Sequence, residues 1–202
     1  MYRIDAFLIM DAVGMQSTRI VSSEAEALIL VDADDQPLGE MSKAEAHDGA
    51  GVLHRAFSVF LFNSRGELLL QQRAPGKRLW PEYWSNSCCS HPRVGETMAI
   101  ATQRRLDDEL NLVTELEYVY RFQYQATYNE AGSEHELCHV FLGRCPDEIA
   151  VNESEIAAVR FVPAADVRRM LDDAPERYTP WFKMEWERLR GEFADSLRRY
   201  AV

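Results

Sequence analysis

Residues 96–112 read ETMAIATQRRLDDELNL and predict a helix over about residues 96–110. Met98, Ala101, Arg105 and Leu106 recur at helical spacing, and Glu96 stands near the expected start of the helix. Strand-like segments precede this stretch and follow it along the chain. We therefore expect one central helix between two groups of strands.

The flanking segments predict six strands and two further helices. The expected strands are residues 27–32, 54–62, 67–73, 119–128, 136–145 and 159–163, and the expected C-terminal helices are residues 164–173 and 180–199. Residues 63–66 join two of these strands as a hairpin loop. An order of strands, one helix, strands and then helices predicts an α+β fold, with a mixed sheet flanked by helices.

The composition is typical of a globular protein in the cytoplasm. The chain has 202 residues, 47% of them hydrophobic, and no linker, repeat or low-complexity segment stands out. Apolar runs such as AFLIM are far too short to span a bilayer, and Asp5 and Asp11 argue against a signal peptide. Four cysteines do not make a disulfide framework in a chain of this size, so we expect free thiols.

Charge is unevenly distributed along the chain. The formal net charge is −11, which argues against a nucleic-acid binder or a binder of anionic membranes. Residues 41–105 nevertheless carry nine basic and five acidic side chains, together with three of the five histidines. A local basic patch suits a small, multiply charged anion such as a diphosphate, and ordinary scatter of surface charges is the alternative.

Residues 85–92, SNSCCSHP, admit three interpretations: a redox pair, a metal clip or half of a catalytic site. Adjacent cysteines rarely bond to each other, because the geometry is strained. A zinc clip made by Cys88 and Cys89 is disfavoured, because zinc ligands usually leave two to four residues between them. Cys89 and His91 are spaced by two, so in extended backbone their side chains point to the same face.

A second pair, Glu134 and Glu136, has the same spacing and lies beside an apolar segment. A carboxylate that is turned toward the interior needs a metal, a cation or a proton to compensate it. With His47, His54 and His91, the pair makes a plausible set of three histidines and two glutamates for a divalent cation. The alternatives are exposed acids at a strand end and histidines with ordinary structural partners.

The predicted central helix also resembles the Nudix box, G-x5-E-x7-R-E-U-x-E-E-x-G-U, in which U is aliphatic. The positions that fall at the spacing of the box are Ser90, Glu96, Arg104, Leu106, Asp108, Glu109, Asn111 and Leu112. Among them, Ser90 replaces the first Gly, Asp108 a Glu and Asn111 the second Gly. Arg105 replaces the Glu that follows Arg in the box, which removes a metal ligand and supplies a phosphate-binding cation. The degraded box indicates diphosphate chemistry without indicating hydrolysis.

With the blocks around this box, the chain resembles the type I isopentenyl-diphosphate isomerases. The resemblance rests on HRAFSVFLFN, LWPEYW, SNSCCSHP, FQYQAT, SEHELCHVF and TPWF, in this order. It runs from about residue 24 to about residue 190 and implies a Nudix-type α/β/α sandwich. We therefore expect a single domain over residues 24–202, after an N-terminal extension over residues 1–23 that is a packed segment, an association surface or disordered.

The resemblance also implies roles for individual residues. Cys89 falls on the reactive cysteine of the family, Glu136 on its acidic partner, and Tyr124 beside that partner. The implied ligands of one divalent cation (Mn²⁺, Mg²⁺ or Zn²⁺) are His47, His54, His91, Glu134 and Glu136. Glu109 would hold a Mg²⁺ that enters with the substrate diphosphate, and the implied substrate-binding residues are Lys43, Arg73, Lys77, Arg105 and Trp181.

The implied reaction interconverts isopentenyl diphosphate and dimethylallyl diphosphate through a tertiary carbocation, in isoprenoid biosynthesis and without a flavin. Glu136 with Tyr124 would deliver one proton and Cys89, as a thiolate, would remove another. Trp181 would shield the cation and stabilise it by about 2 kcal/mol or more. We expect a cytoplasmic monomer or weak homodimer that acts on this small molecule.

Two rival functions remain open at this point. A Nudix pyrophosphohydrolase would use the same fold and metals, but Arg105 and the pair of Cys89 and Glu136 count against it. A non-catalytic module that binds a nucleotide or metabolite would tolerate the loss of acid–base groups, and none is missing from this chain.

Overall fold

A mixed nine-stranded sheet is the centre of the computed structural model, which describes residues 18–201. The strands are β1 (Ala27–Val31), β2 (Pro37–Ser42), β3 (His54–Phe62), β4 (Glu67–Arg73), β5 (Trp84–Ser85), β6 (Cys88–Ser90), β7 (Leu116–Asn129), β8 (Gly132–Arg144) and β9 (Ile156–Pro163). The helices are α1 (Lys43–Ala46), α2 (Met98–Leu110), α3 (Ala164–Asp173), the 3₁₀ turn η1 (Pro175–Arg177), α4 (Pro180–Arg190) and α5 (Ala194–Arg198).

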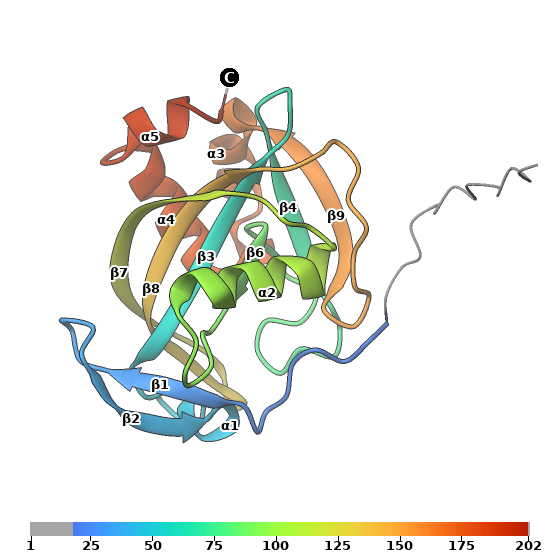
Figure 1. Cartoon of the computed structure of the whole chain (residues 1–202). Coiled ribbons are helices and arrows are strands. Elements are labelled where there is room, and N and C mark those ends of the chain that lie inside the picture. The colour runs from blue at the N-terminus through green and yellow to red at the C-terminus, as the bar shows by residue number, and fades with distance from the viewer. Residues whose placement is uncertain (1–17, 202) are drawn as a thin grey trace, which may run out of the picture.

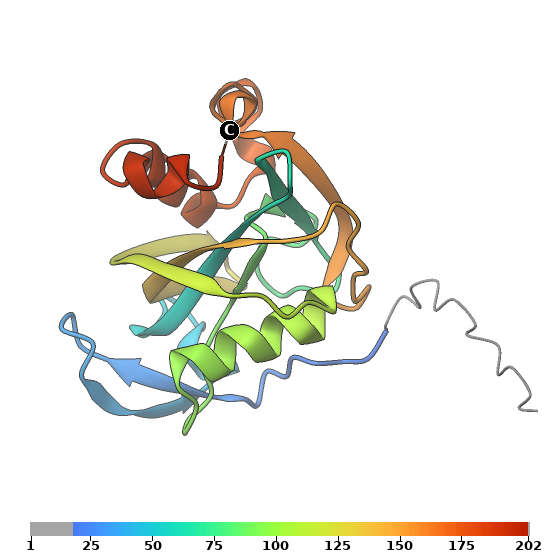
Figure 2. The same cartoon turned by 45° about the horizontal axis from the view of Figure 1, so that its top comes forward.

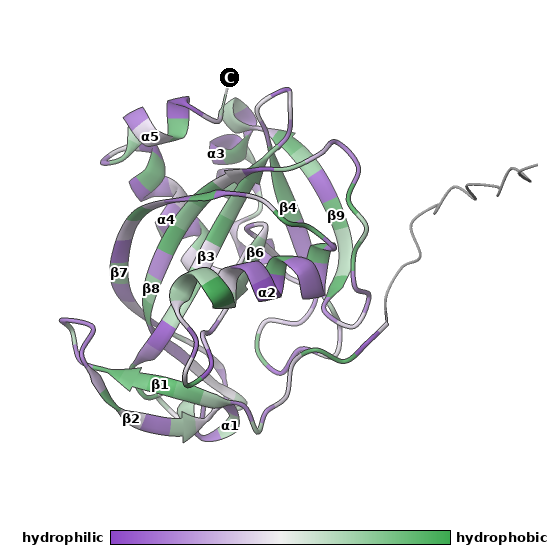
Figure 3. Cartoon of the chain, in the orientation of Figure 1, coloured by the Kyte–Doolittle hydropathy of each residue, from purple (hydrophilic) through white to green (hydrophobic). Residues whose placement is uncertain are grey.

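Strand β3 organises this sheet. It pairs in parallel with β8 over its whole length and is antiparallel to its other partners, β1, β6 and β4. All of its residues except Arg55 are buried, and it is apolar along most of its length in Figure 3. A parallel pairing that is covered on both faces explains why HRAFSVFLF is a nearly continuous apolar run.

Helices cover both faces of the sheet (Figures 1 and 2). On one face, Ala101, Leu106 and Leu110 of α2 pack into an apolar cluster with residues of β3 and β4. On the other face, helices α3, α4 and α5 contribute to a larger core that contains Phe182 and Trp186. The predicted α+β fold, a mixed sheet flanked by helices, is confirmed.

Helix α2 forms where the sequence predicts it, two residues shorter at its start. Thr97 is the N-cap, and its hydroxyl oxygen accepts a hydrogen bond from the amide of Ile100 at 3.3 Å. Asn111 ends the helix in the left-handed conformation, at φ 48°, which asparagine tolerates. The cap residues thus fix both ends of the helix that carries Arg105 and Glu109.

The structure differs from the predicted elements in three places. The helix predicted over residues 180–199 is two helices, because α4 ends at Gly191. Strands β7 and β8 extend beyond their predicted bounds and pair as one long hairpin. The prediction also missed α1 and the strands β2, β5 and β6. Strand β2 lacks an apolar pattern because four of its six residues are exposed, and α1, β5 and β6 are too short to show a periodicity.

The predicted N-terminal extension, residues 1–23, lies mostly outside the described residues. Within residues 18–23, Val21 is buried, and its carbonyl accepts hydrogen bonds from Arg105 at 3.1 Å and from Arg93 at 3.3 Å. The boundary at residue 24 stays a prediction. Within residues 18–201, no helix has the length and apolar character that a membrane crossing requires.

Candidate active site

A cavity of about 290 Å³ brings together most of the residues that the sequence singled out. Every predicted site residue except His54 and Glu109 lies on its wall: Lys43, His47, Arg73, Lys77, Cys89, His91, Arg105, Tyr124, Glu134, Glu136 and Trp181. His54 and Glu109 are buried beside it, in contact with lining residues. The cavity therefore combines a thiol, carboxyl groups, cations and an aromatic face.

Five side chains form a compact group of metal-type donors at one side of this cavity. Each of them offers a ligand atom within 4.8 Å of the others, and the five are His47, His54, His91, Glu134 and Glu136. They come from the end of α1, the start of β3, the residue after β6, and β8. Segments that are far apart in the sequence thus supply one set of nitrogen and oxygen donors.

The strand registers bring His54 and Tyr124 to the two sides of Glu136. In the parallel pair of β3 and β8, His54 lies opposite Glu136, and in the hairpin of β7 and β8, Tyr124 lies opposite the same residue. Residues opposite each other on paired strands project to one face. The hydroxyl of Tyr124 accordingly donates a hydrogen bond to Glu136 Oε2 at 2.7 Å.

A close backbone approach places His47 beside Glu134. Gly132 begins β8 with φ 138°, and a Cβ at this position would lie 2.1 Å from the carbonyl oxygen of His47. The next residue, Ser133, donates its amide to that carbonyl at 3.0 Å. His47 Nε2 then lies 2.8 Å from Glu134 Oε2.

The hydrogen bonds of the histidines leave lone pairs directed at the carboxylates. Nδ1 of His47 lies 2.8 Å from the carbonyl of Lys43, and Nδ1 of His54 lies 2.7 Å from the carbonyl of Val52. A carbonyl only accepts, so each Nδ1 carries the proton and Nε2 of the neutral ring is a bare acceptor. Both Nε2 atoms and Glu134 Oε2 lack hydrogen-bond partners within residues 18–201. Acceptors that face one another in this way fit a divalent cation between them.

The ionisation of these groups is consistent with such a cation. Burial lowers the pKa of His54 to about 3 and also lowers the pKa of His91, so both rings are neutral. Burial alone would lower the pKa of His47, but the carboxylates of Glu134 and Glu136 together raise it above its ordinary value. Burial and the nearby carboxylate of Glu134 raise the pKa of Glu136. A positive charge inside the group would relieve the repulsion between the two carboxylates.

The two adjacent cysteines face opposite sides of the sheet. Cys88 is 0% exposed and packs in the apolar cluster beneath α2, whereas Cys89 lines the cavity. This difference follows from the alternation of side chains along β6, which pairs with β3 so that Cys89 lies opposite Ser58. Cys89 is therefore the thiol that a bound ligand can reach.

Burial raises the pKa of Cys89 to about 12, and the cation of Arg73 opposes this effect. The Nε and Nη2 groups of Arg73 donate to the carbonyls of Trp80 and Leu79 at 3.0 and 2.9 Å. These bonds hold its Nη1 4.0 Å from the sulfur of Cys89. The guanidinium also lies 5.3 Å from the ring centre of Trp181, so a fixed positive charge stands between the thiol and the indole.

Aromatic rings close the remaining side of the cavity. Trp181 is 3% exposed, meets Trp80 edge to face at 5.3 Å, and lies 6.3 Å from the ring of Tyr124. Helix α4 supplies Trp181 from its first turn, after Pro180. The wall formed by these rings excludes water and presents π-electron density to whatever the cavity holds.

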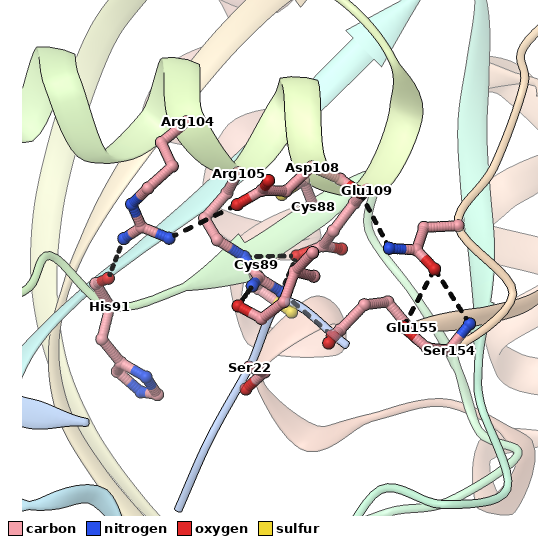
Figure 4. Close-up of polar contacts among 12 residues, drawn as sticks. Ser22, Cys88, Cys89, His91, Arg104, Arg105, Asp108, Glu109, Ser154 and Glu155 are labelled. Carbon is pink, nitrogen blue, oxygen red and sulfur yellow. Dashed lines mark hydrogen bonds and ion pairs between the residues drawn. The ribbon is translucent and has the colours of Figure 1, made fainter. Parts of the chain in front are cut away.

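The other three predicted diphosphate-binding cations also line the cavity, and each already has an acceptor. Lys43 donates to the hydroxyl of Ser22 at 2.8 Å, and Lys77 forms an ion pair with Glu155. Arg105 is 3% exposed and lies between Glu109 and Glu155, with its Nη2 3.0 Å from Glu155 (Figure 4).

Sequence reasoning missed Glu155 and the segment around Ser22. Glu155 precedes β9, and its carbonyl accepts the amide of Ala74 just after β4, so the pairing of β4 and β9 brings it to Lys77 and Arg105. No local spacing signals such a contact, because Glu155 is fifty residues from Arg105. Ser90, which the box motif had marked only as a substitute for glycine, also lines the cavity.

Comparison with protein families gives a match over most of the chain. The family model of the NUDIX domain matches residues 52–182. The matched range contains α2, the strands β3 to β9 and the first residues of α4, and hence most of the cavity.

Curated relatives match over an even longer range. The chain is 43% identical over 174 residues to isopentenyl-diphosphate Delta-isomerase 1 of Photorhabdus laumondii subsp. laumondii, a match that covers 85% of this chain and 99% of that relative. It is also 43% identical over 160 residues to the isopentenyl-diphosphate Delta-isomerase of Halorhodospira halophila, over 78% of this chain and 91% of the relative.

Solved structures agree on the fold. DR0079 from Deinococcus radiodurans matches with a TM-score of 0.63 at 22% identity, over 88% of this chain and 100% of that one. The MutT protein of Methanosarcina mazei Go1 matches with a TM-score of 0.58 at 16% identity, over 69% of this chain and 94% of that one. At these identities the likeness concerns the arrangement of helices and strands.

Proposed function

Because this chain belongs to the isopentenyl-diphosphate Delta-isomerases of the Nudix family, we infer that it interconverts isopentenyl diphosphate and dimethylallyl diphosphate. The observation that carries this inference is that the Cys89 thiol and the Glu136 carboxyl line one cavity beneath an aromatic wall. Moving the double bond adds a proton at one carbon and removes one from another, so the reaction needs an acid and a base around one substrate.

We propose that Glu136 and Tyr124 deliver the proton to the alkene and that Cys89 removes the other. The hydrogen bond from Tyr124 fixes one oxygen of Glu136 and connects this carboxyl to the aromatic wall. Proton addition leaves a tertiary cation, and loss of a neighbouring proton to the sulfur completes the shift of the double bond. The reverse reaction exchanges the two roles.

This mechanism requires the Cys89 thiolate, which burial disfavours. The fixed Arg73 cation 4.0 Å from the sulfur is the group that favours it. Cys89 and Glu136 share one mobile proton, so one of them is protonated when the other is not. Arg73 therefore shifts that proton toward Glu136, which is the arrangement that protonation of the alkene needs.

The family and the group of five donors indicate dependence on a divalent cation. We propose that His47, His54, His91, Glu134 and Glu136 hold Mn²⁺, Mg²⁺ or Zn²⁺, which supplies positive charge that orients Glu136. We further propose that Glu109 takes part in binding a Mg²⁺ that accompanies the diphosphate. Lys43, Arg73, Lys77 and Arg105 would bind the phosphate oxygens.

A carbocation must be kept from water, which would convert it to an alcohol. Trp181 is the group best placed for this task, because it is nearly fully buried and faces the cavity beside Tyr124. Its ring also stabilises positive charge by a cation–π contact of about 2 kcal/mol when desolvated.

The test is proton NMR of isopentenyl diphosphate with the purified protein and Mg²⁺ in D₂O, with released phosphate followed in parallel. We expect dimethylallyl diphosphate that carries deuterium and no free phosphate. Phosphate release without isomerisation would show a Nudix hydrolase instead. If metal-loaded protein forms neither dimethylallyl diphosphate nor free phosphate, both activities are refuted.

We also propose that the protein acts in the cytoplasm as a monomer or weak homodimer on this soluble diphosphate, without nucleic acid or membrane. Sedimentation velocity over a range of protein concentrations tests the oligomeric state, and a tight dimer at the lowest concentration would contradict the proposal.

A further inference from the structure

Glu185 is a buried carboxyl group for which the proposed reaction has no use. It lies on α4, is 0% exposed, and its Oε1 accepts a hydrogen bond from the thiol of Cys138 at 3.4 Å. The Ser58 hydroxyl is a second hydrogen-bonding neighbour of this carboxyl, Oε2 has no other partner, and no cationic side chain pairs with the group, within residues 18–201. Burial raises its pKa to about 8, so the group is a neutral carboxylic acid near pH 7.

This acid lies one side-chain layer behind the reactive groups. Cys138 follows Glu136 by two residues on β8, so the two side chains share a face of the sheet. The Cys138 thiol also lies 3.5 Å from the hydroxyl of Ser58, which is the cross-strand partner of Cys89. Glu185 therefore contacts β8, which carries Glu136, directly, and Ser58 of β3 links it to β6, which carries Cys89.

The same contact joins α4 to the sheet. Trp181 precedes Glu185 by four residues, so the two side chains lie on one face of the helix. The backbone carbonyl of Glu185 also accepts a hydrogen bond from the hydroxyl of Tyr120 on β7 at 3.2 Å. Two strands thus hold this turn of α4, and the position of the turn determines where the Trp181 ring lies over the cavity.

A fully buried acid whose only side-chain partners are a thiol and a hydroxyl is unfavourable for folding, and an apolar side chain of similar size would avoid the penalty. Such groups concentrate at functional sites, where geometry or charge justifies them. Glu185 lies between α4, which carries Trp181, and β8, which carries Glu136, and this position is a geometric reason for a buried acid.

We propose that Glu185 is a positioning residue that docks α4 on β8 and so sets where Trp181 lies over the reacting carbons. It acts through Trp181, and its side chain is not on the cavity wall. This role rests on the proposed isomerase function.

The surroundings explain why the acid must stay neutral. The titratable groups that face it are Cys138 and Glu136 from β8, Cys89 from β6 and Tyr120 from β7. None of these is a cation, and Arg188 of the same helix stacks on the rings of Tyr120 and Phe122. A negative charge on Glu185 would meet only neutral or negative neighbours and would loosen the contact with β8.

Two substitutions separate the hydrogen bond from the volume of the side chain. Glu185→Gln keeps a neutral acceptor for the Cys138 thiol, whereas Glu185→Leu keeps most of the volume and removes the acceptor. Glu187→Gln is the matched control, because Glu187 lies on the same helix and pairs at the surface with Arg168 and Arg190.

We expect Glu185→Gln and the control to retain kcat within about twofold of wild type. Glu185→Leu should lower kcat about 10- to 100-fold, because small displacements of an aligned group reduce rates on this scale. KM should change little, because the diphosphate-binding cations are on other elements, and Tm should not fall. An unchanged kcat in Glu185→Leu would overturn the proposal. A fall in kcat together with a rise in KM and a fall in Tm would also overturn it, because this combination marks a general structural role.

A double-substitution experiment tests whether the effect passes through Trp181. In a Trp181→Phe background, Glu185→Leu should lower kcat by less than about twofold further, because the ring that it positions is already altered. A full additional decrease would show that Glu185 acts by another route and would overturn the proposal.

Infrared spectroscopy tests the neutral acid independently of activity. Wild type near pH 7 should show the carbonyl band of a buried protonated carboxyl that is absent from Glu185→Gln. If the wild type does not isomerise isopentenyl diphosphate, the proposed function fails. The infrared band then still shows whether the Glu185 carboxyl is protonated. Absence of the band would overturn the neutral-acid assignment whatever the activity.

Discussion

Substituting Gly132 by Ala should damage the metal-type site from a distance, through the backbone of His47. A Cβ at position 132 would lie 2.1 Å from the His47 carbonyl oxygen, whereas ordinary van der Waals contacts of a Cβ lie at 3.4–4 Å. Either α1 or the start of β8 must therefore move by about 1 Å. His47 Nε2 and Glu134 Oε2, now 2.8 Å apart, lie on the two segments that separate.

The energetic cost follows from the same geometry. The φ of 138° at Gly132 belongs to a region that is almost restricted to glycine, which costs about 1–3 kcal/mol for another residue. Loss of the hydrogen bond from the Ser133 amide to His47 adds about 1 kcal/mol. Gly132→Ala should therefore lower the free energy of unfolding by about 2–4 kcal/mol.

Gly49→Ala is the matched control. Gly49 also has a positive φ, 58°, but a Cβ there meets nothing within 4 Å, so its cost should be about 1 kcal/mol. Urea unfolding gives the two free energies, and titration with Mn²⁺ or Zn²⁺ gives the metal affinities. We expect at least about a tenfold loss of affinity in Gly132→Ala alone. Equal stabilities and equal metal affinities in the two variants would refute the reasoning.

Three further predictions concern individual side chains. Cys89→Ala should abolish isomerisation, whereas Cys88→Ala should keep kcat. Cys88→Ala should lower the free energy of unfolding by about 1–2 kcal/mol, because it leaves a small cavity under α2. Similar activities of the two variants in the NMR assay would contradict the assignment of the reactive thiol. Arg105→Ala should raise KM for the diphosphate substrate and lower the free energy of unfolding by about 3–5 kcal/mol, because two buried carboxylates lose their cation; a fall in kcat at unchanged KM and stability would argue against this. Glu185 has a folded-state pKa of about 8, above the ordinary value of 4.5, so the free-energy penalty of keeping it buried grows as pH rises between these values. The stability of Glu185→Gln relative to wild type should increase by about 3 kcal/mol between about pH 5.5 and about pH 8.5 in urea unfolding, and parallel pH curves would rule the raised pKa out.

The sequence predicts those parts of the fold and site in which local spacing settles where side chains point. The spacing of two residues predicts that Glu134 and Glu136 share a face, and both lie on β8 within one group of donors. The spacing of Cys89 and His91 was interpreted in the same way, and both line the cavity. Helix α2 was predictable because its apolar positions recur over more than three turns.

Spacing fails where a contact depends on pairing between distant segments. The meeting of His54 with Glu136 requires the parallel register of β3 and β8, and the meeting of His47 with Glu134 requires the approach that Gly132 permits. The sequence suggested that these residues could converge but contained no signal of how. Glu185 shows the same limit, because nothing local distinguishes this buried acid from the exposed Glu187 two residues later.

The sequence predicts the excess of basic side chains within residues 41–105, but it does not predict which acidic side chain the fold brings into contact with them. The basic excess within residues 41–105 corresponds to real cavity cations, since Lys43, Lys77 and Arg105 all lie on the wall. The fold, however, brings Glu155 from the acidic part of the chain into contact with both Lys77 and Arg105. A diphosphate that reaches these cations must compete with a carboxylate already in place, so the site attracts its ligand less strongly than the count of basic residues suggests. The acid in turn keeps the cations ordered when no ligand is bound, which lowers the entropy lost when the diphosphate arrives.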